Sequence, residues 1–377
     1  MDREELTAWL RLQLTPGVGN ATARRLLAAF GLPQQVFAAS LQALEQVASA
    51  QQCVALHTVP PELPTLLEAT WQWQESNPLQ CRVMTLGDAS YPQSLLQMED
   101  PPLLLYGMGA QRVWANNALA REVSRSLAIV GSRNPTPQGA VNARQFSQSL
   151  AQAGLAIVSG LALGVDGAAH EGALAGAPEG QLATIAVVGT GLDRVYPKQH
   201  RDLAHRIVQN GVLLSEYPLG TPPLAANFPR RNRIIAGLAH GTLVVEAALQ
   251  SGSLITARLA LEQGKDVFAI PGSIHSTQAR GCHALIKQGA KLVESAQDVL
   301  EEFLPGTTAS RPADAGTPDG EEDSLLLALG FSPVGLDALQ ARTGLDTPTL
   351  QARLMEQEIR GQLARLPGGL FQRIARG

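Results

Sequence analysis

Two short apolar runs separated by a helical segment constrain the fold of this chain more than any other feature. The runs are Leu127–Val130 and Leu155–Val158, and residues 139–153 between them have apolar positions at helical spacing. Short, continuous apolar runs that alternate with helices predict parallel strands buried on both faces of a sheet. Each run ends at a glycine with a small polar residue, so the strand ends leave backbone N–H groups open. Ligands bind at this carboxyl edge of an open α/β sheet.

The alternation of apolar runs and helices continues to about residue 304. Further strands are expected at Ala183–Val188, Val212–Leu214, Thr242–Val245, Val267–Ile270 and Lys291–Val293. Further helices are expected at Gly167–Ala175, Gln199–Asn210, Asn232–Leu238, Ser253–Gln263 and Ala284–Gln288. The fold class is therefore α/β, with an extended Rossmann-like, mostly parallel sheet over residues 81–304. The proline-rich segment 81–126 is expected to add a short helix and an edge strand.

Residues 1–80 are expected to form a small helical domain. Gly17 and Gly19 lie between two helical patterns, and the basic pair Arg24-Arg25 follows, so the segment resembles a SAM-like or helix-hairpin-helix unit. The backbone of such a hairpin would bind nucleic-acid phosphate. In the alternative interpretation, which we slightly favour, the glycines only supply the tight turns of a packing unit.

The carboxyl-terminal part of the chain is expected to be a separate domain. Residues 305–322 are rich in proline, glycine, threonine and acidic residues, which is typical of a linker. Residues 323–377 then show a helix-turn-helix pattern followed by a hairpin, which together suggest a winged helix. Its second helix, Thr347–Ile359, mixes arginine with glutamate, whereas a helix that reads duplex DNA has a clear basic face. This favours a protein-contact role.

Composition limits the classes of function. The net charge is -4, so nucleic-acid binding must come from a local patch. The three cysteines, Cys53, Cys81 and Cys282, are scattered and do not have the spacing of metal ligands. An odd, scattered set indicates a reducing compartment. With no signal peptide and no apolar run of membrane-spanning length, we expect a cytoplasmic protein with no membrane partner and no metal.

The strand ends predict an anion site. The first run ends at Gly131-Ser132-Arg133 and the second at Ser159-Gly160. Backbone N–H groups at the start of the following helices attract phosphate, and the Arg133 guanidinium suits phosphate oxygens. The third strand leads to Lys198, another candidate cation. Ser251-Gly252-Ser253 opens a later helix with further N–H and hydroxyl donors.

The usual cofactor motifs do not occur. After Gly131 the next glycine is Gly139, so there is no G-x-G-x-x-G fingerprint, and no P-loop sequence is present. We therefore expect neither a dinucleotide nor any other cofactor.

An arginine-rich segment follows the fourth strand of the predicted sheet. Asn227–Arg233 contains Arg230, Arg231 and Arg233 beside Phe228. Positive charge beside a ring suits a groove that follows a single strand and stacks its bases. In the alternative interpretation, some of these arginines pair with Glu216 or Glu246 at the sheet edge. We expect both to be partly true, with Arg233 the structural one.

Two sets of groups could carry catalysis. Asp166 and His170 lie four residues apart on one helix, so they could form a proton-transfer pair or part of a metal site. We favour the structural interpretation, in which an Asp complements the helix dipole and the His is hydrogen-bonded. Glu216 and Glu246 are the only carboxylates at strand ends with catalytic potential. We assign no catalytic residue.

A series of motifs in order covers about residues 85–300. It comprises Gly131-Ser132-Arg133, Ser159-Gly160-Leu161-Ala162, Gly164-Val165-Asp166 with His170, Tyr196-Pro197-Lys198, Ser215-Glu216-Tyr217-Pro218, Asn227–Leu238, Val244–Ala247, Ser251–Leu254 and Pro271-Gly272. As a set, these motifs resemble the DNA-processing protein A family, also called DprA or Smf. The flanking helical and winged-helix segments look like that family's accessory parts.

The resemblance implies a function. The family binds single-stranded DNA that enters the cell during natural transformation, protects it, and loads RecA onto it while displacing single-strand-binding protein. It acts as a homodimer and is not known to catalyse a reaction. Arg133 and Lys198 would grip the DNA backbone. The full set of DNA-binding residues that we expect is Gly131, Ser132, Arg133, Ser159, Gly160, Lys198, Arg201, Asn227, Phe228 and Arg230.

Two positions depart from the family pattern. The family often has asparagine where this chain has His200 and His283. Both histidines keep a hydrogen-bonding side chain, so the pocket is expected to survive.

Two other functions compete with DNA binding. Rossmann-like nucleotide phosphoribohydrolases carry a Pro-Gly-Gly-x-Gly-Thr segment before a catalytic glutamate. Here Gly241-Thr242 and Glu246 are the nearest counterpart, and the Pro-Gly-Gly part is missing. A sequence-specific regulator would use the winged helix, but the mixed charge of that domain's second helix argues against it.

Overall fold

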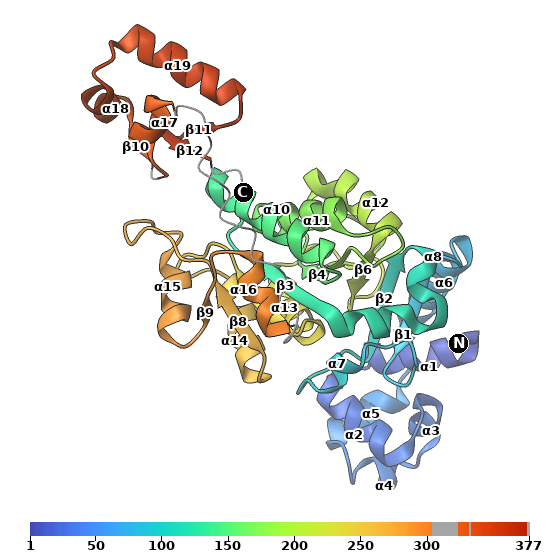
Figure 1. Ribbon diagram of the computed structural model, residues 1–377. Coiled ribbons are helices and arrows are strands. Elements are labelled where there is room, and N and C mark those ends of the chain that lie inside the picture. The colour runs from blue at the N-terminus through green and yellow to red at the C-terminus, as the bar shows by residue number, and fades with distance from the viewer. Residues whose placement is uncertain (304–322, 332, 375–377) are drawn as a thin grey trace.

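The central element is a mostly parallel sheet, which we describe in a computed structural model of the chain. The structure describes residues 1–303, 323–331 and 333–374. The strands of the large sheet are β1 (Cys81–Thr85), β2 (Leu104–Gly109), β3 (Ser126–Val130), β4 (Ala156–Ser159), β5 (Thr184–Val187), β6 (Val212–Ser215), β7 (Gly241–Val244), β8 (Asp266–Ala269) and β9 (Lys291–Leu292). Within these ranges they form a nine-stranded sheet in the order β1-β2-β6-β5-β4-β3-β7-β8-β9 (Figure 1).

The direction of the strands divides the sheet into two parts. From β6 to β9, each strand pairs in parallel with its neighbours in this part of the sheet. The strands β1 and β2 pair antiparallel, and β2 also joins β6 antiparallel. The predicted Rossmann-like α/β fold is therefore confirmed. The strand expected at the edge from residues 81–126 is β2, but β1 covers it and takes the edge position.

Helices cover both faces of the sheet. On one face they are α7 (Gln93–Leu96), α8 (Gln111–Trp114), α9 (Ala118–Glu122), α13 (Asn227–Leu238), α14 (Ser253–Glu262) and α15 (Arg280–Lys287). On the other face they are α10 (Pro137–Gln152), α11 (Val165–Gly176), α12 (Arg201–Asn210) and α16 (Ala296–Phe303). Because apolar side chains alternate between the two faces along each strand, every central strand is buried, as the continuous apolar runs predict.

The helices α10 and α11 pack unusually closely. A Cβ atom added to Gly172 would lie 2.1 Å from the carbonyl oxygen of Arg144, and one added to Gly176 would lie 2.2 Å from that of Gln148. Only glycine fits at these two positions. The close contact fixes α11, whose first turn forms part of the site described below.

Smaller units flank the sheet. The first comprises α1 (Arg3–Leu14), α2 (Asn20–Phe30), α3 (Pro33–Ala38), α4 (Leu41–Leu44), α5 (Ala50–His57) and α6 (Leu63–Ser76), as the sequence predicts for residues 1–80. The second comprises α17 (Ser324–Leu329), β10 (Val334–Gly335), α18 (Leu336–Thr343), α19 (Thr347–Ile359), β11 (Leu363–Leu366) and β12 (Leu370–Arg373). This second unit is the predicted winged helix, with its own apolar core. The predicted linker, 305–322, lies outside the described residues.

One helix starts earlier than predicted. The expected helix Asn232–Leu238 begins at Asn227, so Arg230 and Arg231 lie on α13 and not in a loop. Pro229 does not prevent this, because the first N–H groups of a helix have no intrahelical partner and a proline there costs no hydrogen bond.

Across residues 1–303, 323–331 and 333–374, no helix combines the length and apolar character that crossing a lipid bilayer requires.

Candidate nucleic-acid interface

The candidate site lies between β3 and β7, where successive strands begin to be added on the other side of the sheet. From β3 the chain proceeds through α10 to β4 on one side, and from β7 it proceeds through α14 to β8 on the other. Because β3 and β7 are neighbours, their carboxyl ends open next to each other. This is the topological switch point of an open α/β sheet, where ligand crevices form.

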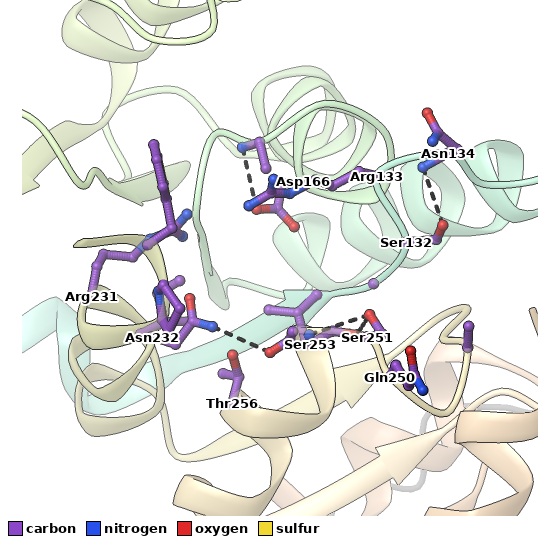
Figure 2. Close-up of a pocket in the computed structure, with 18 of the residues that line it drawn as sticks. Ser132, Arg133, Asn134, Asp166, Arg231, Asn232, Gln250, Ser251, Ser253 and Thr256 are labelled. Atoms are coloured by element: carbon purple, nitrogen blue, oxygen red, sulfur yellow. Dashed lines mark hydrogen bonds between the residues drawn. The ribbon is translucent and has the colours of Figure 1, made fainter. Parts of the chain in front are cut away.

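A cavity of about 530 Å³ occupies the switch point (Figure 2). A volume of this size suits a small-molecule ligand or one nucleotide. Its polar and charged walls come from the loop after β3, the first turn of α11, helix α13, the loop and first turn of α14, and the segment before α15. These lining residues are Ser132, Arg133, Asn134, Asp166, Arg231, Asn232, Gln250, Ser251, Ser253, Thr256 and Gln278.

The loop after β3 is held by backbone and side-chain hydrogen bonds. The N–H of Ser132 donates to the carbonyl oxygen of Glu246 at 2.7 Å, and its hydroxyl accepts the N–H of Asn134 at 3.1 Å. Arg133 is exposed at the mouth of the cavity. The structure thus places Gly131, Ser132 and Arg133 together in the cavity wall.

The carboxylate of Glu246 has a structural task. It accepts hydrogen bonds from the N–H of Thr136 at 2.9 Å and from its hydroxyl at 2.6 Å, and Thr136 in turn caps α10. Burial raises the pKa of Glu246, and these hydrogen bonds partly offset the rise. A carboxylate held in this way at a helix start is not presented to a ligand.

In the turn after β4, two residues expected to contact DNA are buried. Ser159 is fully buried, and its hydroxyl donates to the carbonyl oxygen of Ile129 at 2.7 Å. Gly160 is also buried, and its N–H donates to Asp166 Oδ2 at 3.1 Å. Neither offers a polar group to a ligand, contrary to the sequence prediction. They act on the site indirectly, by shaping the turn.

Leu161 in this turn has a left-handed backbone, with φ of 57°. Such a conformation costs a β-carbon-bearing residue free energy and persists only where its surroundings hold it. Here His170 Nε2 accepts the N–H of Leu161 at 3.3 Å, and His200 Nδ1 donates to its carbonyl oxygen at 2.9 Å. His200, one of the two departures from the family pattern, therefore holds a backbone turn.

The contacts of Asp166 and His170 support the structural interpretation of this pair. Asp166 accepts two backbone N–H groups of the β4 turn, and the other ring nitrogen of His170 lies 2.7 Å from the hydroxyl of Thr184. Burial, with smaller contributions from His200 and Arg231, lowers the pKa of His170 to about 3. The ring is neutral at physiological pH, so it acts as a scaffold for the turn.

A row of cation and rings leads out of the cavity. The Arg133 guanidinium lies 5.7 Å from the centroid of the Phe228 ring, and the Phe228 ring lies 5.4 Å from that of Tyr196. Tyr196 is 45% exposed. Lys198 and Arg201, both exposed, follow two and five positions later along the chain. Lys198, however, is outside the cavity itself.

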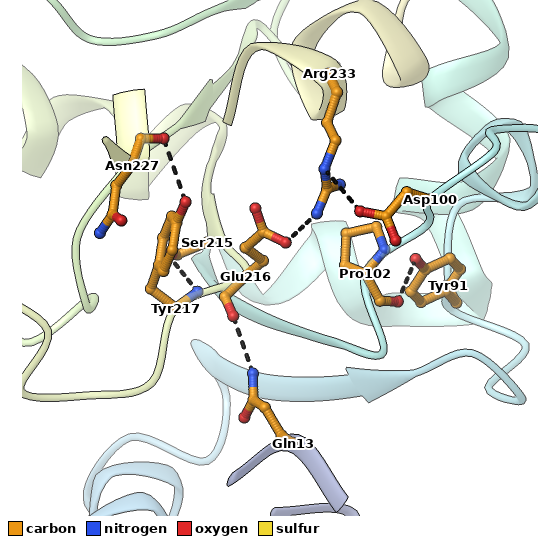
Figure 3. A network of polar contacts seen from close by, with 9 residues as sticks. All are labelled: Gln13, Tyr91, Asp100, Pro102, Ser215, Glu216, Tyr217, Asn227 and Arg233. Atoms are coloured by element: carbon orange, nitrogen blue, oxygen red, sulfur yellow. Dashed lines mark hydrogen bonds and ion pairs between the residues drawn. The ribbon is translucent and has the colours of Figure 1, made fainter. Parts of the chain in front are cut away.

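The arginines of α13 serve different purposes. Arg233 forms an ion pair with Glu216 and a longer one with Asp100 at 3.5 Å, so it is structural, as predicted (Figure 3). Burial raises the pKa of Glu216, and Arg233 opposes that rise. Arg230 is exposed, whereas Arg231 is buried and lines the cavity.

Asn227 was also expected to contact DNA, but it is buried. Its side chain is 7% exposed and donates to the carbonyl oxygen of Gly189 at 3.1 Å. It positions α13, and with it Phe228, and offers no free amide group to a ligand.

Sequence reasoning missed several residues of the cavity wall. Asn134, Gln250 and Gln278 follow no recognisable spacing, because they come from separate segments. Asn232 and Thr256 lie in segments that the sequence singled out, but they had no role assigned to them. Arg231 was not distinguished from its neighbours. Its signal would have been its position: three residues after Phe228 on a helix, it lies on the same face.

Among the residues that the structure describes, no group of His, Cys, Asp or Glu side chains is arranged to hold a metal ion. The second departure from the family pattern, His283, is used elsewhere. Its Nε2 lies 3.0 Å from the carbonyl oxygen of Gly272 and holds the turn after β8.

Comparison with known proteins covers most of the chain. Residues 82–304 match the family described as DNA recombination-mediator protein A, and residues 309–369 match the DprA winged helix domain. Protein Smf of Escherichia coli K12 is 42% identical over 288 residues, which cover 74% of each chain. DNA processing protein DprA of Streptococcus pneumoniae is 49% identical over 216 residues, covering 57% of this chain and 72% of that protein.

Solved structures agree with these sequence matches. The X-ray structure of DNA processing protein A from Streptococcus pneumoniae superposes with a TM-score of 0.65 at 36% identity, covering 80% of this chain and 98% of that one. A structure that describes the single-stranded DNA binding mode of DNA processing protein A from Helicobacter pylori has a TM-score of 0.51 at 31% identity. It covers 59% of this chain and 96% of that one.

Proposed function

Since the chain belongs to the DNA recombination-mediator protein A family, we propose that it binds single-stranded DNA at the carboxyl edge of its sheet. The observation that carries the proposal is the row formed by Arg133, Phe228 and Tyr196 beside the cavity. Cations that follow a backbone next to exposed rings are the usual means of holding an unpaired strand, because bases stack on the rings. The related protein from Helicobacter pylori, whose single-stranded DNA binding mode is described, supports this choice of ligand.

We further propose that the direct contacts come from Gly131, Ser132, Arg133, Lys198, Arg201, Phe228 and Arg230. The exposed cations among them would neutralise phosphates, so the protein would bind DNA locally despite its net charge of -4. Ser159, Gly160 and Asn227 would act by shaping the site.

The proposed role is that of a mediator and not of an enzyme. Glu246 holds the start of α10 and Glu216 pairs with Arg233, so both carboxylates at the strand ends have structural partners. No serine or cysteine of the cavity wall lies beside a general base. Such a site would hold a phosphodiester without cleaving it.

Binding alone does not promote recombination, so a mediator needs a partner. The family's description as a recombination mediator supports a partner-dependent role. We propose that this protein protects incoming DNA during natural transformation in the cytoplasm. It would load RecA onto that DNA, displace single-strand-binding protein, and work as a homodimer. Two linked sites would raise the effective concentration of the second once the first is filled.

The test of binding is a competition between oligonucleotides. A labelled single strand bound to the protein is challenged with unlabelled single-stranded or blunt duplex DNA of the same sequence. Preference for the single strand, with an affinity that falls with salt by a logarithmic slope of about -0.7 per phosphate contact, is expected. Equal competition by the duplex would contradict the proposal.

The test of mediation is RecA strand exchange on DNA coated with single-strand-binding protein. The full chain is expected to shorten the lag, and light scattering is expected to show a dimer. Absence of stimulation, together with release of free base from nucleoside monophosphates by the purified protein, would favour the phosphoribohydrolase alternative.

A further inference from the structure

Arg231 is a buried cation whose hydrogen-bonding groups have no acceptor. Its residue is 4% exposed, and its Nε is buried without a partner. Within the ranges that the structure describes, the guanidinium takes part in no hydrogen bond and no ion pair shorter than 4 Å. Buried guanidinium groups normally bond to carboxylates or carbonyl oxygens, since leaving such donors unpaired is costly. The unused donors therefore indicate a ligand.

The nearby carboxylate does not meet this need. Asp166 is close enough to favour the charged form of Arg231, but Asp166 Oδ2 accepts the backbone N–H groups of Gly160 and Ala162. Asp166 therefore balances part of the Arg231 charge, while its hydrogen bonds hold the β4 turn.

The position of Arg231 is set by the backbone beneath it. A Cβ atom added to Gly160 would lie 1.4 Å from Arg231 Nη1, so the guanidinium lies directly over that glycine. Arg231 of α13 lines the same cavity as the β3 loop and the start of α14 (Figure 2). It lies on the same face of α13 as Phe228, one helical turn further along.

The start of α14 faces the same space. Its N-cap, Gly252, makes no side-chain capping bond, and Ser251, Ser253 and Thr256 line the cavity. Asn232 Nδ2 donates to the carbonyl oxygen of Gly252 at 3.2 Å, which ties α14 to the helix that carries Arg231. The N–H groups of Ser253, Leu254 and Ile255 are bonded within this turn, to Ser251 Oγ and to the carbonyl oxygens of Ser251 and Gly252. The start of α14 therefore favours an anion through its helix dipole and through the hydroxyl groups that line the cavity.

We propose that Arg231 and the first turn of α14 form an inner phosphate subsite of the cavity whose mouth carries Arg133. The inference rests on the proposed function and deepens it. One nucleotide of the strand enters the cavity, with its phosphate on Arg231 and α14, while Arg133 and the rings hold the chain that continues outside. The cavity volume of about 530 Å³ accommodates one nucleotide.

The decisive comparison is Gly252→Asp against Gly252→Asn in the full chain. A side chain at Gly252 has open space, since no atom lies within 4 Å of its Cβ, and its φ of -60° suits any residue. The two side chains have nearly the same shape, and the aspartate charge favours the helix dipole, so the Asp variant should melt at no lower temperature than the Asn variant. It should nevertheless bind a single-stranded oligonucleotide about tenfold or more weakly, because its charge repels the phosphate.

A second variant tests the arginine itself. Arg231→Gln should flatten the logarithmic salt dependence of DNA binding by about 0.7, the contribution of one phosphate contact. Arg258→Gln is the matched control, because it removes an exposed cation from α14 outside the cavity and should leave the slope as it is. A purely structural role for Arg231 would lower the melting temperature and leave the salt slope unchanged.

The outcomes separate the two proposals. If the parent binds single-stranded DNA and the Asp and Asn variants bind it equally, the inner subsite is wrong and the proposed function stands. If the parent binds no oligonucleotide, the proposed function is wrong. Thymidine monophosphate then tests the subsite alone, because it should raise the melting temperature of the parent and not that of Gly252→Asp.

Discussion

At the scale of single residues, neighbouring members of one motif carry out different tasks. Arg230, Arg231 and Arg233 lie within one turn of α13, yet one is exposed, one is buried in the cavity and one pairs with Glu216. The reason is helical geometry, because successive residues point about 100° apart and meet solvent, ligand cavity and sheet in turn. The motif identifies the residue types, and the position of each residue on the helix determines what its side chain contacts.

We predict that Arg133→Ala and Lys198→Ala each weaken single-strand binding without unfolding the protein. Each substitution removes one exposed cation and with it one phosphate contact, so the magnitude of the logarithmic salt slope should fall by about 0.7. Fluorescence anisotropy over a range of salt measures this, and the free energy of unfolding should change by no more than about 0.5 kcal/mol. Arg82→Ala, an exposed change on the edge strand β1, is the control. Unaltered binding by either variant would place the site elsewhere.

A second prediction concerns the pH dependence of stability. The pKa of His170 falls from its ordinary value of 6.5 to about 3 in the folded protein, because burial disfavours the charged ring. Below the unfolded value, only the unfolded chain takes up this proton. Stability therefore falls as the pH decreases from about 6.5 towards 3, by up to about 1.4 kcal/mol per pH unit.

Denaturation in urea at about pH 7 and about pH 5.5 measures the effect, within the window in which His170 titrates only in the unfolded chain. His170→Gln lacks the titrating group, so its free energy of unfolding should depend less on pH. An equally steep dependence in this variant would show that His170 is charged in the folded state.

At the scale of elements, the site depends on how closely two helices approach. Gly172 and Gly176 lie four residues apart on α11, where they form one face that contacts α10. This contact fixes the first turn of α11, and with it Asp166 and the β4 turn. The position of the cavity residues on α11 is therefore set by the opposite face of the same helix, which packs against α10.

We predict that Gly172→Ala destabilises the protein by about 1–3 kcal/mol, the usual cost of overpacking. The added methyl group would lie 2.1 Å from a backbone oxygen of α10, which cannot turn away as a side chain could. Thermal unfolding measures the change. Gly87→Ala, whose Cβ meets no atom within 4 Å, is the control, and equal stability of the two variants would contradict the predicted close packing.

At the scale of the whole molecule, the sheet unit contains all the residues assigned to the site. The winged helix has a separate apolar core, and the pairs Glu356–Arg360 and Glu358–Arg365 leave its second helix without a basic face. The N-terminal helices, by contrast, share a core with the sheet, and Gln13 donates to the carbonyl oxygen of Glu216 at 3.0 Å (Figure 3).

We therefore predict that residues 306–377 are dispensable for binding single-stranded DNA. A chain ending at residue 304 should fold and bind an oligonucleotide within about threefold of the full chain, because domains with separate cores act independently. Circular dichroism checks folding and anisotropy checks affinity at matched salt. A folded truncation that no longer binds would transfer part of the site to the winged helix.

The sequence alone determined the class of the protein and the edge of the sheet at which the cavity opens. Continuous apolar runs specify buried parallel strands, and the glycine with a polar residue after each run specifies where backbone donors open. These features are local, so the pattern reveals them. The expected strands, the winged helix and the cluster around Arg133 were all within reach of this reasoning.

The tertiary structure alone decided which segments meet. Pairing of β3 with β7, which lie more than one hundred residues apart, brings α14 opposite Arg133, and no local pattern encodes that choice of neighbour. The structure also decided burial, since it covers the hydroxyl of Ser159 and encloses Arg231 while leaving Arg230 in solvent. Residue types and spacings are properties of the chain, whereas access to a ligand depends on everything packed around each side chain.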